Sequence, residues 1–170
     1  MPTATYEPIA TQTLGSAQSS VTFNSFSGYT DLVLVASARS AYTTDASDGL
    51  RLRLNSDSGT NYSWTNLGGN VSNAFSGRAS SVNIGEIGSL ATSSSSNTAF
   101  GVCIANFQNY ANTTTYKTII SRSGEARLVN YGYTTLWRST SAITEIVLSS
   151  ARASNFVAGS TFTLYGIKAA

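Results

Sequence analysis

The chain contains no histidine, one cysteine and only eight carboxylates in 170 residues. Histidine is the side chain that titrates near neutral pH, and it is the commonest metal ligand and catalytic base. Its absence, together with the few carboxylates, argues against acid–base, nucleophilic and metal-dependent chemistry, and we expect no cofactor. The sequence therefore favours a protein that binds or builds over an enzyme.

Charge is also scarce. Charged residues make up 11% of the chain, less than half of the usual share of about 25%. The net charge is +2, and eight of the ten cations are Arg, scattered without a basic run. Nucleic-acid binding needs a concentrated basic face, so no nucleic-acid partner is expected.

Long apolar stretches are missing as well. The first residues, Met1 to Tyr6, have neither a basic start nor an apolar core, so no signal peptide is expected. No run approaches the length of about 18 apolar residues that a membrane-spanning helix requires. These features predict synthesis in a cytoplasm without standard export, and no membrane partner. The single Cys103 lies in an apolar run and is expected to be a buried thiol.

Serine and threonine, by contrast, number 50, and nine Tyr, seven Phe and two Trp supply apolar area for a core. Apolar and polar residues alternate in many short segments separated by turn residues. This spacing predicts an all-β domain, a sandwich or barrel of about ten strands with almost no helix. The expected strands are 21–23, 31–38, 50–54, 62–64, 82–84, 100–104, 116–120, 127–131, 143–148 and 162–167.

The clearest alternation is Leu50-Arg51-Leu52-Arg53-Leu54, with three Leu inward and two Arg outward. A slip of one residue would bury both Arg, so the register is strongly fixed. Arg51 and Arg53 then share an exposed face and are candidate binding residues. The expected core comprises Leu50, Leu52, Leu54, Val82, Ile84, Val102, Ile104, Ile146, Leu148, Phe162 and Leu164.

Residues 1–20 are small and polar, with Tyr6 and Ile9 as isolated large side chains and Pro8 between them. We divide the chain into an extended N-terminal arm with a first strand, residues 1–20, and a single β-sandwich domain, residues 21–170. Two roles of the arm remain open. It docks on a neighbouring subunit or shell through Tyr6 and Ile9, or it packs as a strand on its own domain.

Catalytic alternatives are weak. No Gly-x-Ser-x-Gly elbow accompanies the many serines. Asp45, Asp48 and Asp57 could form a carboxylate pair for glycoside hydrolysis, but Asp48-Gly49 and Asp57-Ser58-Gly59 read as ordinary turns. A Ca²⁺ contact at Asp45 and Asp48 does not fit the spacing of an EF-hand loop.

The segment from Tyr131 to Arg138 is rich in Tyr, Trp and Arg, a composition enriched at interfaces. Tyr133, Trp137 and Arg138 are therefore candidate binding residues. The alternative is that Trp137 closes one end of the core.

Several short segments follow one another along nearly the whole chain. They are Tyr6-Glu7-Pro8-Ile9-Ala10, Leu54-Asn55, Asp57, Gly59, Asn61-Tyr62-Ser63, Tyr116-Lys117-Thr118, Leu136-Trp137-Arg138-Ser139 and Phe162-Thr163-Leu164-Tyr165-Gly166-Ile167-Lys168. In this order they resemble a family of tailed-phage virion proteins, which includes capsid decoration (cement) proteins and terminal domains of tail fibres.

The resemblance implies a jelly-roll-like β-sandwich, a homotrimer, and a place on the outer surface of a virion. It implies no catalytic residues. The sequence shows no coiled-coil heptads or fibre repeat, which favours a decoration protein bound to the major capsid protein or another virion protein. The alternative is a tail-fibre or tail-associated protein that recognises host surface glycan.

Overall fold

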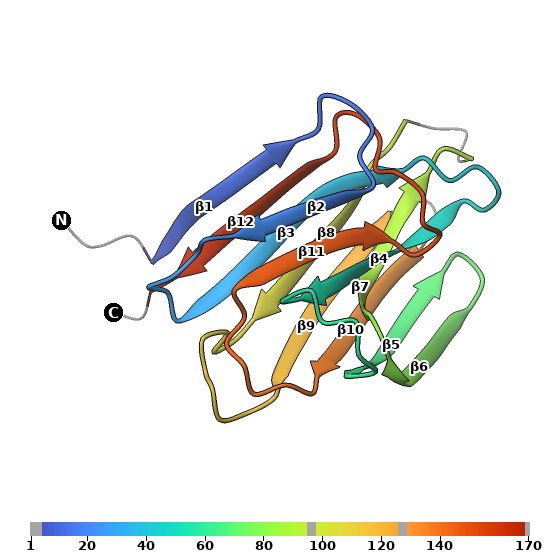
Figure 1. Ribbon diagram of the computed structural model, residues 1–170. Helices are drawn as coiled ribbons and strands as arrows, with labels where there is room; N and C mark the ends of the chain where they lie inside the picture. The colour runs from blue at the N-terminus through green and yellow to red at the C-terminus, as the bar shows by residue number, and fades with distance from the viewer. Residues whose placement is uncertain (1–4, 95–97, 126–128, 169–170) are drawn as a thin grey trace.

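The computed structural model describes residues 5–94, 98–125 and 129–168 (Figure 1). These residues form twelve β-strands and no helix, so the predicted all-β class is confirmed. The strands belong to one hydrogen-bonded sheet that folds over itself into two layers, as a sandwich does. No helix of the length and hydropathy needed to cross a bilayer occurs in this described part of the chain.

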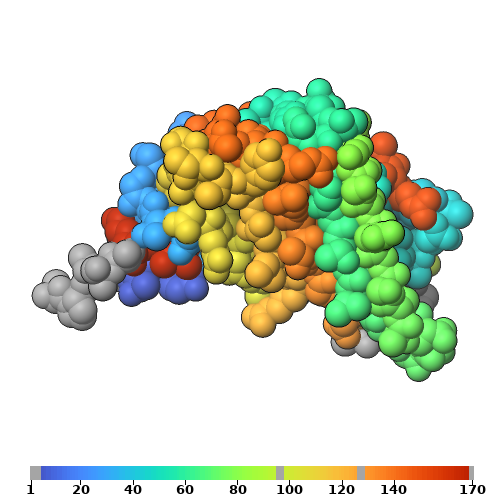
Figure 2. All heavy atoms as spheres, turned by 90° about the horizontal axis from the view of Figure 1, so that it is seen from below, coloured from blue at the N-terminus to red at the C-terminus, as the bar shows by residue number. Residues whose placement is uncertain are grey.

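The large layer contains eight strands, all antiparallel to their neighbours. In Figure 2, β8, β9, β10, β5 and β6 follow one another across the molecule as adjacent bands from yellow through orange to green. In spatial order the strands are β1 (Tyr6–Thr13), β12 (Thr161–Ile167), β3 (Asp31–Ser40), β8 (Gly101–Phe107), β9 (Lys117–Glu125), β10 (Val129–Trp137), β5 (Tyr62–Asn70) and β6 (Ala74–Val82).

The small layer contains four strands and lies in front of the large layer in Figure 1. Its order is β2 (Ser20–Asn24), β11 (Glu145–Ser150), β4 (Ser47–Leu54) and β7 (Gly85–Thr92). The layers join where Arg39 and Ser40 at the end of β3 pair in parallel with Ala91 and Thr92 of β7.

The core lies between the layers, and the strongest sequence signals account for its centre. Leu50, Leu52 and Leu54 are fully buried on β4, while Arg51 and Arg53 face outward. Of the other predicted core residues, four are also fully buried: Ile146, Leu148, Phe162 and Leu164. The alternation was thus sufficient to orient these strands. In β4 a slipped register would bury Arg, and in β11 and β12 it would turn the large apolar side chains away from the core.

The prediction was wrong for β8. Cys103, Ala105 and Phe107 point into the core, whereas Val102 is 47% exposed and Ile104 is half-buried on the opposite face. Both faces of this strand carry apolar side chains, so the sequence does not show which face points into the core. The packing of the layers decides it. Strand β7 passes close over β8, where Cys103 Sγ lies 3.4 Å from the Ile87 carbonyl, and only small side chains fit there.

The prediction was also wrong between residues 74 and 92. Of the expected strand 82–84, Val82 is the last residue of β6, and residues 83–84 form the turn to β7. Val82 and Ile84 are only half-buried, although Val82 packs against the core. Both flanking strands consist largely of Gly, Ser and Ala, which have weak β-propensity. Their conformation is imposed by pairing with β5 and β4.

The expected strands 116–120 and 127–131 also predict a hairpin with its turn at 123–125. The two strands pair as neighbours, but Ser123 and Glu125 lie within β9. Residues 127–128 of the expected strand 127–131 lie outside the described residues, and residues 129–131 belong to β10. The run of four serines at 93–96 predicts an exposed loop over residues 91–97. Ala91 and Thr92 are instead buried at the end of β7, and residues 95–97 lie outside the described part.

The N-terminal segment shows the second of the two alternatives. Its residues 6–13 form β1, which pairs with β12 of the same chain along its whole length. Ile9 packs partly against the core, while Tyr6 is 57% exposed at the start of the strand. Thus Ile9 contacts the core of its own domain.

Strand β7 has an unusual edge. Over Gly85–Ser89 it pairs with β4 on one side only, and hydroxyls of the large layer satisfy backbone groups on the other. The Ser121 hydroxyl donates to the Ile87 carbonyl at 2.6 Å, Thr135 donates to the Glu86 carbonyl, and the Ser89 amide donates to Ser123 Oγ at 2.9 Å. The inward hydroxyls of β9 and β10 therefore take the place of a partner strand.

This contact requires a close approach of the two layers. A Cβ on Gly88 would lie 2.8 Å from both Cβ and Oγ of Ser123, which is too close. Glycine at this position therefore allows β7 to settle onto the large layer, and it fixes where the small layer ends.

Candidate functional site

The large layer is wider than the small one, and the difference creates a step. Strand β7 is the last strand of the small layer, and it packs over β9 and β10. Strands β5 and β6 continue the large layer beyond it, as Figure 1 shows. We call this boundary between β7 and the inner face of β10 the step.

A row of aromatic side chains covers the inner face of the large layer at the step. Ring centroids lie 6.0 Å apart for Trp64 and Tyr133, 5.4 Å for Tyr133 and Tyr131, and 5.1 Å for Tyr131 and Phe75. The strand register produces the row, since Gly68 of β5 lies between Tyr131 and Phe75. A Cβ on Gly68 would collide with both rings, so glycine lets them lie over the backbone.

The small layer contributes an ion pair to the same place. Arg51 and Glu86 are cross-strand neighbours on β4 and β7, and Arg51 Nε lies 3.5 Å from Glu86 Oε2. The Glu86 side chain is only 15% exposed. Burial raises the pKa of Glu86 above its ordinary value, and the Arg51 guanidinium opposes that rise. Gly49 gives the carboxylate its place, because a Cβ there would be 2.8 Å from Glu86 Oε1.

Tyr133 reaches this carboxylate from the large layer. Its hydroxyl donates to Glu86 Oε1 at 3.5 Å, a long hydrogen bond. Burial, and then the charge of Glu86, raise the pKa of Tyr133 well above its ordinary value. The phenol therefore keeps its proton at neutral pH and acts as a donor.

These groups surround a cavity of about 280 Å³ at the step, which we call the step pocket. Its walls come from β4, β7, β10 and the turn after β11, and its polar side chains include Arg51, Glu86, Ser89, Tyr131, Tyr133 and Arg152. Charged groups and hydroxyls thus converge in one concave place, which makes it a candidate ligand site. Its lining is almost wholly polar, whereas most ligand pockets are lined mainly by apolar side chains.

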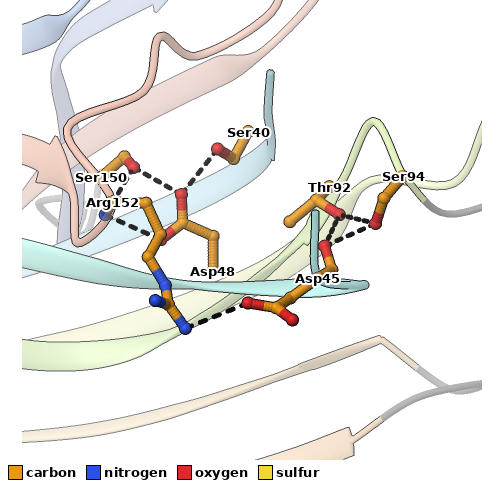
Figure 3. A network of polar contacts seen from close by, with 7 residues as sticks. All are labelled: Ser40, Asp45, Asp48, Thr92, Ser94, Ser150 and Arg152. Atoms are coloured by element: carbon orange, nitrogen blue, oxygen red, sulfur yellow. Dashed lines mark hydrogen bonds and ion pairs between the residues drawn. The ribbon is translucent and has the colours of Figure 1, made fainter. Parts of the chain in front are cut away.

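A buried polar network supports the pocket wall (Figure 3). Asp48 Oδ2 accepts hydrogen bonds from Ser40 Oγ at 2.6 Å and from Ser150 Oγ, and Asp48 Oδ1 accepts one from the Arg152 amide at 3.1 Å. The carboxylate joins β3, β4 and the turn after β11. The prediction of a turn at Asp48-Gly49 was wrong, since both residues lie within β4.

The same figure shows how the adjoining loop is held. Arg152 Nη2 lies 3.2 Å from Asp45 Oδ2, and the Asp45 carbonyl accepts bonds from Thr92 and Ser94 hydroxyls. Arg152 thus links the two carboxylates, through its amide to Asp48 and through its guanidinium to Asp45. Among the residues that the structure describes, no three His, Cys, Asp or Glu side chains gather as a metal site.

A second surface lies on the opposite side of the large layer. Cross-strand register places Val102 and Ile104 of β8, Ile120 and Arg122 of β9 and Leu67 of β5 on this outer face. Val102, Ile120 and Leu67 are 47%, 54% and 72% exposed. We call this surface the outer face.

The outer face is not flat. One open hollow of about 710 Å³ includes Val102, Ile104 and Arg122 in its lining. Another, of about 430 Å³, includes Leu67 and Ile120. An apolar, hollowed sheet face of this kind is typical of a surface that contacts another macromolecule.

The sequence-predicted site residues are spread over these places. Arg51 and Tyr133, about 80 positions apart in the chain, meet in the step pocket. Arg53 lies on the same face of β4 but donates to the Asn83 carbonyl at 3.5 Å, outside the pocket. Tyr6 and Ile9 lie on β1, at the opposite edge of the large layer.

Trp137 and Arg138 have structural contacts. Trp137 is fully buried, in accord with the alternative that it closes the core. Arg138 donates to the Thr60 carbonyl at 2.7 Å and contacts the Ser63 hydroxyl, so it clamps the start of β5.

Sequence reasoning missed Glu86, Tyr131 and Trp64 as pocket residues. Glu86 is a lone charge between Gly85 and Ile87, and nothing near it in the sequence signals a site. Tyr131 was noted only as part of the Tyr-rich segment, and Trp64 only as part of a strand.

Comparison with known proteins adds no relative. The chain matches no family model, no curated protein and no solved structure.

Proposed function

We propose that this protein is a non-enzymatic structural protein of a bacteriophage virion, a capsid decoration protein that binds the outer surface of the shell. The observation that carries the proposal is the outer face, where apolar side chains lie uncovered on a broad sheet. The resemblance of the chain to tailed-phage virion proteins gives the setting.

The composition of the outer face suits a protein partner. Apolar side chains occupy its centre, and Arg122 and Arg78 are exposed within the same surface. Protein–protein interfaces combine an apolar centre with Arg and few other charges. We therefore propose the major capsid protein, or another virion protein with an apolar patch near carboxylates, as the occupant.

Self-association belongs to the same proposal. The resemblance suggests a homotrimer, and closed cyclic symmetry is the common form of soluble oligomers. The chain has one cysteine, buried and free, so no internal disulfide supports the fold. Sedimentation of the purified protein at micromolar concentration should give the mass of three chains, and a stable monomer would contradict this part.

The step pocket favours a second candidate, a tail-fibre or tail-associated protein that recognises host surface glycan. Its aromatic and hydrogen-bonding groups suit a small polar ligand better than a protein surface. The two candidates differ in copy number, because a decoration protein covers the shell and a receptor-binding protein occupies a few tail positions.

The decisive experiment measures copies per particle and capsid binding together. Stained gels of purified virions should show a copy number comparable with that of the major capsid protein. Ile120→Asp should abolish binding of the purified protein to shells that lack it, because the substitution places a charge in the apolar centre. Val71→Asp is the matched control, since Val71 is 88% exposed in the β5–β6 turn.

Both variants should melt near the wild-type temperature, because both positions are exposed. If the gels show only a few copies per particle, the decoration role is excluded and the tail-associated role is favoured. Unchanged capsid binding by Ile120→Asp would exclude the outer face as the docking surface.

A further inference from the structure

We propose that the step pocket binds a neutral, hydroxyl-rich ligand, a single sugar ring of a saccharide. The proposal rests on the chemistry of the pocket and holds for either position of the protein in a virion. It deepens the second candidate function by assigning a ligand class to residues of β4, β7 and β10.

Glu86 provides the first argument. Its side chain is largely buried, yet its two contacts, with Arg51 Nε and the Tyr133 hydroxyl, are both 3.5 Å long. A carboxylate can accept about four hydrogen bonds, so most of its capacity is unused. The hydroxyl groups of a ligand in the pocket would donate to these oxygens and replace the water that burial removes.

Donors surround the same carboxylate. Arg51 uses Nε for Glu86 and Nη1 for the Ala151 carbonyl at 3.3 Å, which leaves Nη2 to donate at the pocket wall. The Tyr133 phenol keeps its proton. A sugar hydroxyl both donates and accepts, so an acceptor at Glu86 beside donors at Arg51 and Tyr133 matches it.

The charge balance distinguishes a sugar from an anion. Arg51 is opposed by Glu86, and Arg152 is paired with Asp45. A phosphate or carboxylate ligand would meet the Glu86 charge in a poorly hydrated place, which disfavours it. The pocket therefore selects hydrogen-bonding groups without net charge.

The tyrosines contribute hydroxyls more than ring faces to the site. Tyr131 and Tyr133 line the pocket, but the Tyr133 ring is only 4% exposed and Trp64 packs against it. The half-buried Tyr131 is the lining ring that contacts the C–H face of a sugar. The volume of about 280 Å³ lies just below the usual range for drug-sized ligands, so one ring fits and a longer chain would extend into solvent.

The site is also rigid. Its side chains stand on three strands, and Asp48 holds the turn that carries Arg152 (Figure 3). Preformed sites lose little entropy on binding. A single sugar still makes few contacts, so we expect a dissociation constant of about 1 mM.

The test is a titration of the isotope-labelled full chain, followed by nuclear magnetic resonance. The probes are the methyl glycosides of glucose, galactose, mannose and N-acetylglucosamine, with inorganic phosphate as the anionic arm. At least one glycoside should shift the amide signals of Glu86, Ser89 and Tyr133 in a saturable manner. Phosphate should leave them unchanged.

Variants locate the site. Glu86→Gln and Tyr133→Phe preserve shape, and each should weaken glycoside binding by about tenfold. Arg53→Gln is the matched control, because Arg53 shares the strand face of Arg51 but lies outside the pocket, and it should bind as the wild type does. The spectrum of each free variant reports whether it is folded.

Three results would overturn the proposal. They are the absence of saturable shifts with all four glycosides, shifts of these amides with phosphate but with no glycoside, and unchanged glycoside affinity in both folded pocket variants. None of these results bears on copy number or capsid binding, so the proposed function and this inference can fail separately.

Discussion

The indole Nε1 of Trp137 donates a hydrogen bond to Oδ2 of Asp57 at 2.7 Å. The bond joins the end of β10 to the turn between β4 and β5, across 80 residues of sequence. Asp57 also accepts bonds from the Gly59 amide at 2.8 Å and the Asn61 side chain at 2.9 Å. The carboxylate predicted to form a turn therefore also anchors the largest core side chain.

Replacing Asp57 should destabilise the fold. Asp57→Ala leaves the buried Trp137 N–H without its partner and should lower the free energy of unfolding by about 1–3 kcal/mol. Asp57→Asn keeps an acceptor and should cost less. Urea denaturation measures both, and equal losses would show that the bond to Trp137 has no special weight.

Asp57 should also make stability depend on pH. Burial alone would raise its pKa, but the bonds from Trp137, Asn61 and Gly59 outweigh burial and lower the pKa below 3.8. A carboxyl with a lowered folded pKa stabilises the native state above its unfolded pKa. That stability is lost as pH falls through the folded pKa, and Asp57→Asn should remove this part of the acid dependence.

Glu86 should act with the opposite sign. Its folded pKa is raised by burial, so the native state binds the proton more readily than the unfolded state does. Stability should therefore fall as pH rises from the unfolded pKa through the folded one. Glu86→Gln should flatten that fall in thermal melts, and an identical pH profile in the variant would contradict the raised pKa.

The hydrogen bonds from hydroxyls of β9 and β10 to the unpaired edge of β7 should contribute to stability, and Ser121 tests this. Ser121→Ala removes the 2.6 Å bond to the Ile87 carbonyl and leaves a buried acceptor poorly satisfied, at a cost of about 1–3 kcal/mol. Thr118→Ala is the matched control on the exposed face of the same strand, with an expected change within about 0.5 kcal/mol. Equal effects would mean that the hydroxyl contributes nothing specific.

The register of β8 predicts a contrast between two apolar truncations. Leu52→Ala opens a cavity in the core and should cost about 2–5 kcal/mol. Val102→Ala acts on the outer face and should cost less than about 0.5 kcal/mol. Chemical denaturation measures both, and a large loss at Val102 would mean that this face is covered in the isolated protein.

Deleting β1 should weaken the isolated domain. The strand covers β12 with a full antiparallel ladder, and Ile9 packs on the core. Removing residues 2–12 exposes that edge and should cost at least about 2 kcal/mol of stability. A deletion that keeps the melting temperature but loses particle binding would instead restore the docking role of this segment.

The sequence was sufficient where one face of a strand had to be polar. Arg51 and Arg53 could not be buried, so Leu50, Leu52 and Leu54 had to face the core. The same reasoning oriented Ile146 and Leu148 and identified the all-β class. In these strands, the wrong register would bury a charged side chain or expose apolar ones. The free-energy cost of either decides which face points inward, whatever the partner strands are.

Where both faces of a strand are apolar, only the tertiary structure decides which face points into the core. In β8 the apolar residues on both faces were equivalent by sequence, and the close passage of β7 selected Cys103 and Ala105 for the inside. The step pocket depends on the same contact. Arg51, Glu86 and Tyr133 meet because small residues let β7 rest on β9 and β10, and because the small layer ends there. Such a contact depends on the complementary shapes of the two layers. The alternation of apolar and polar residues within either layer does not predict it.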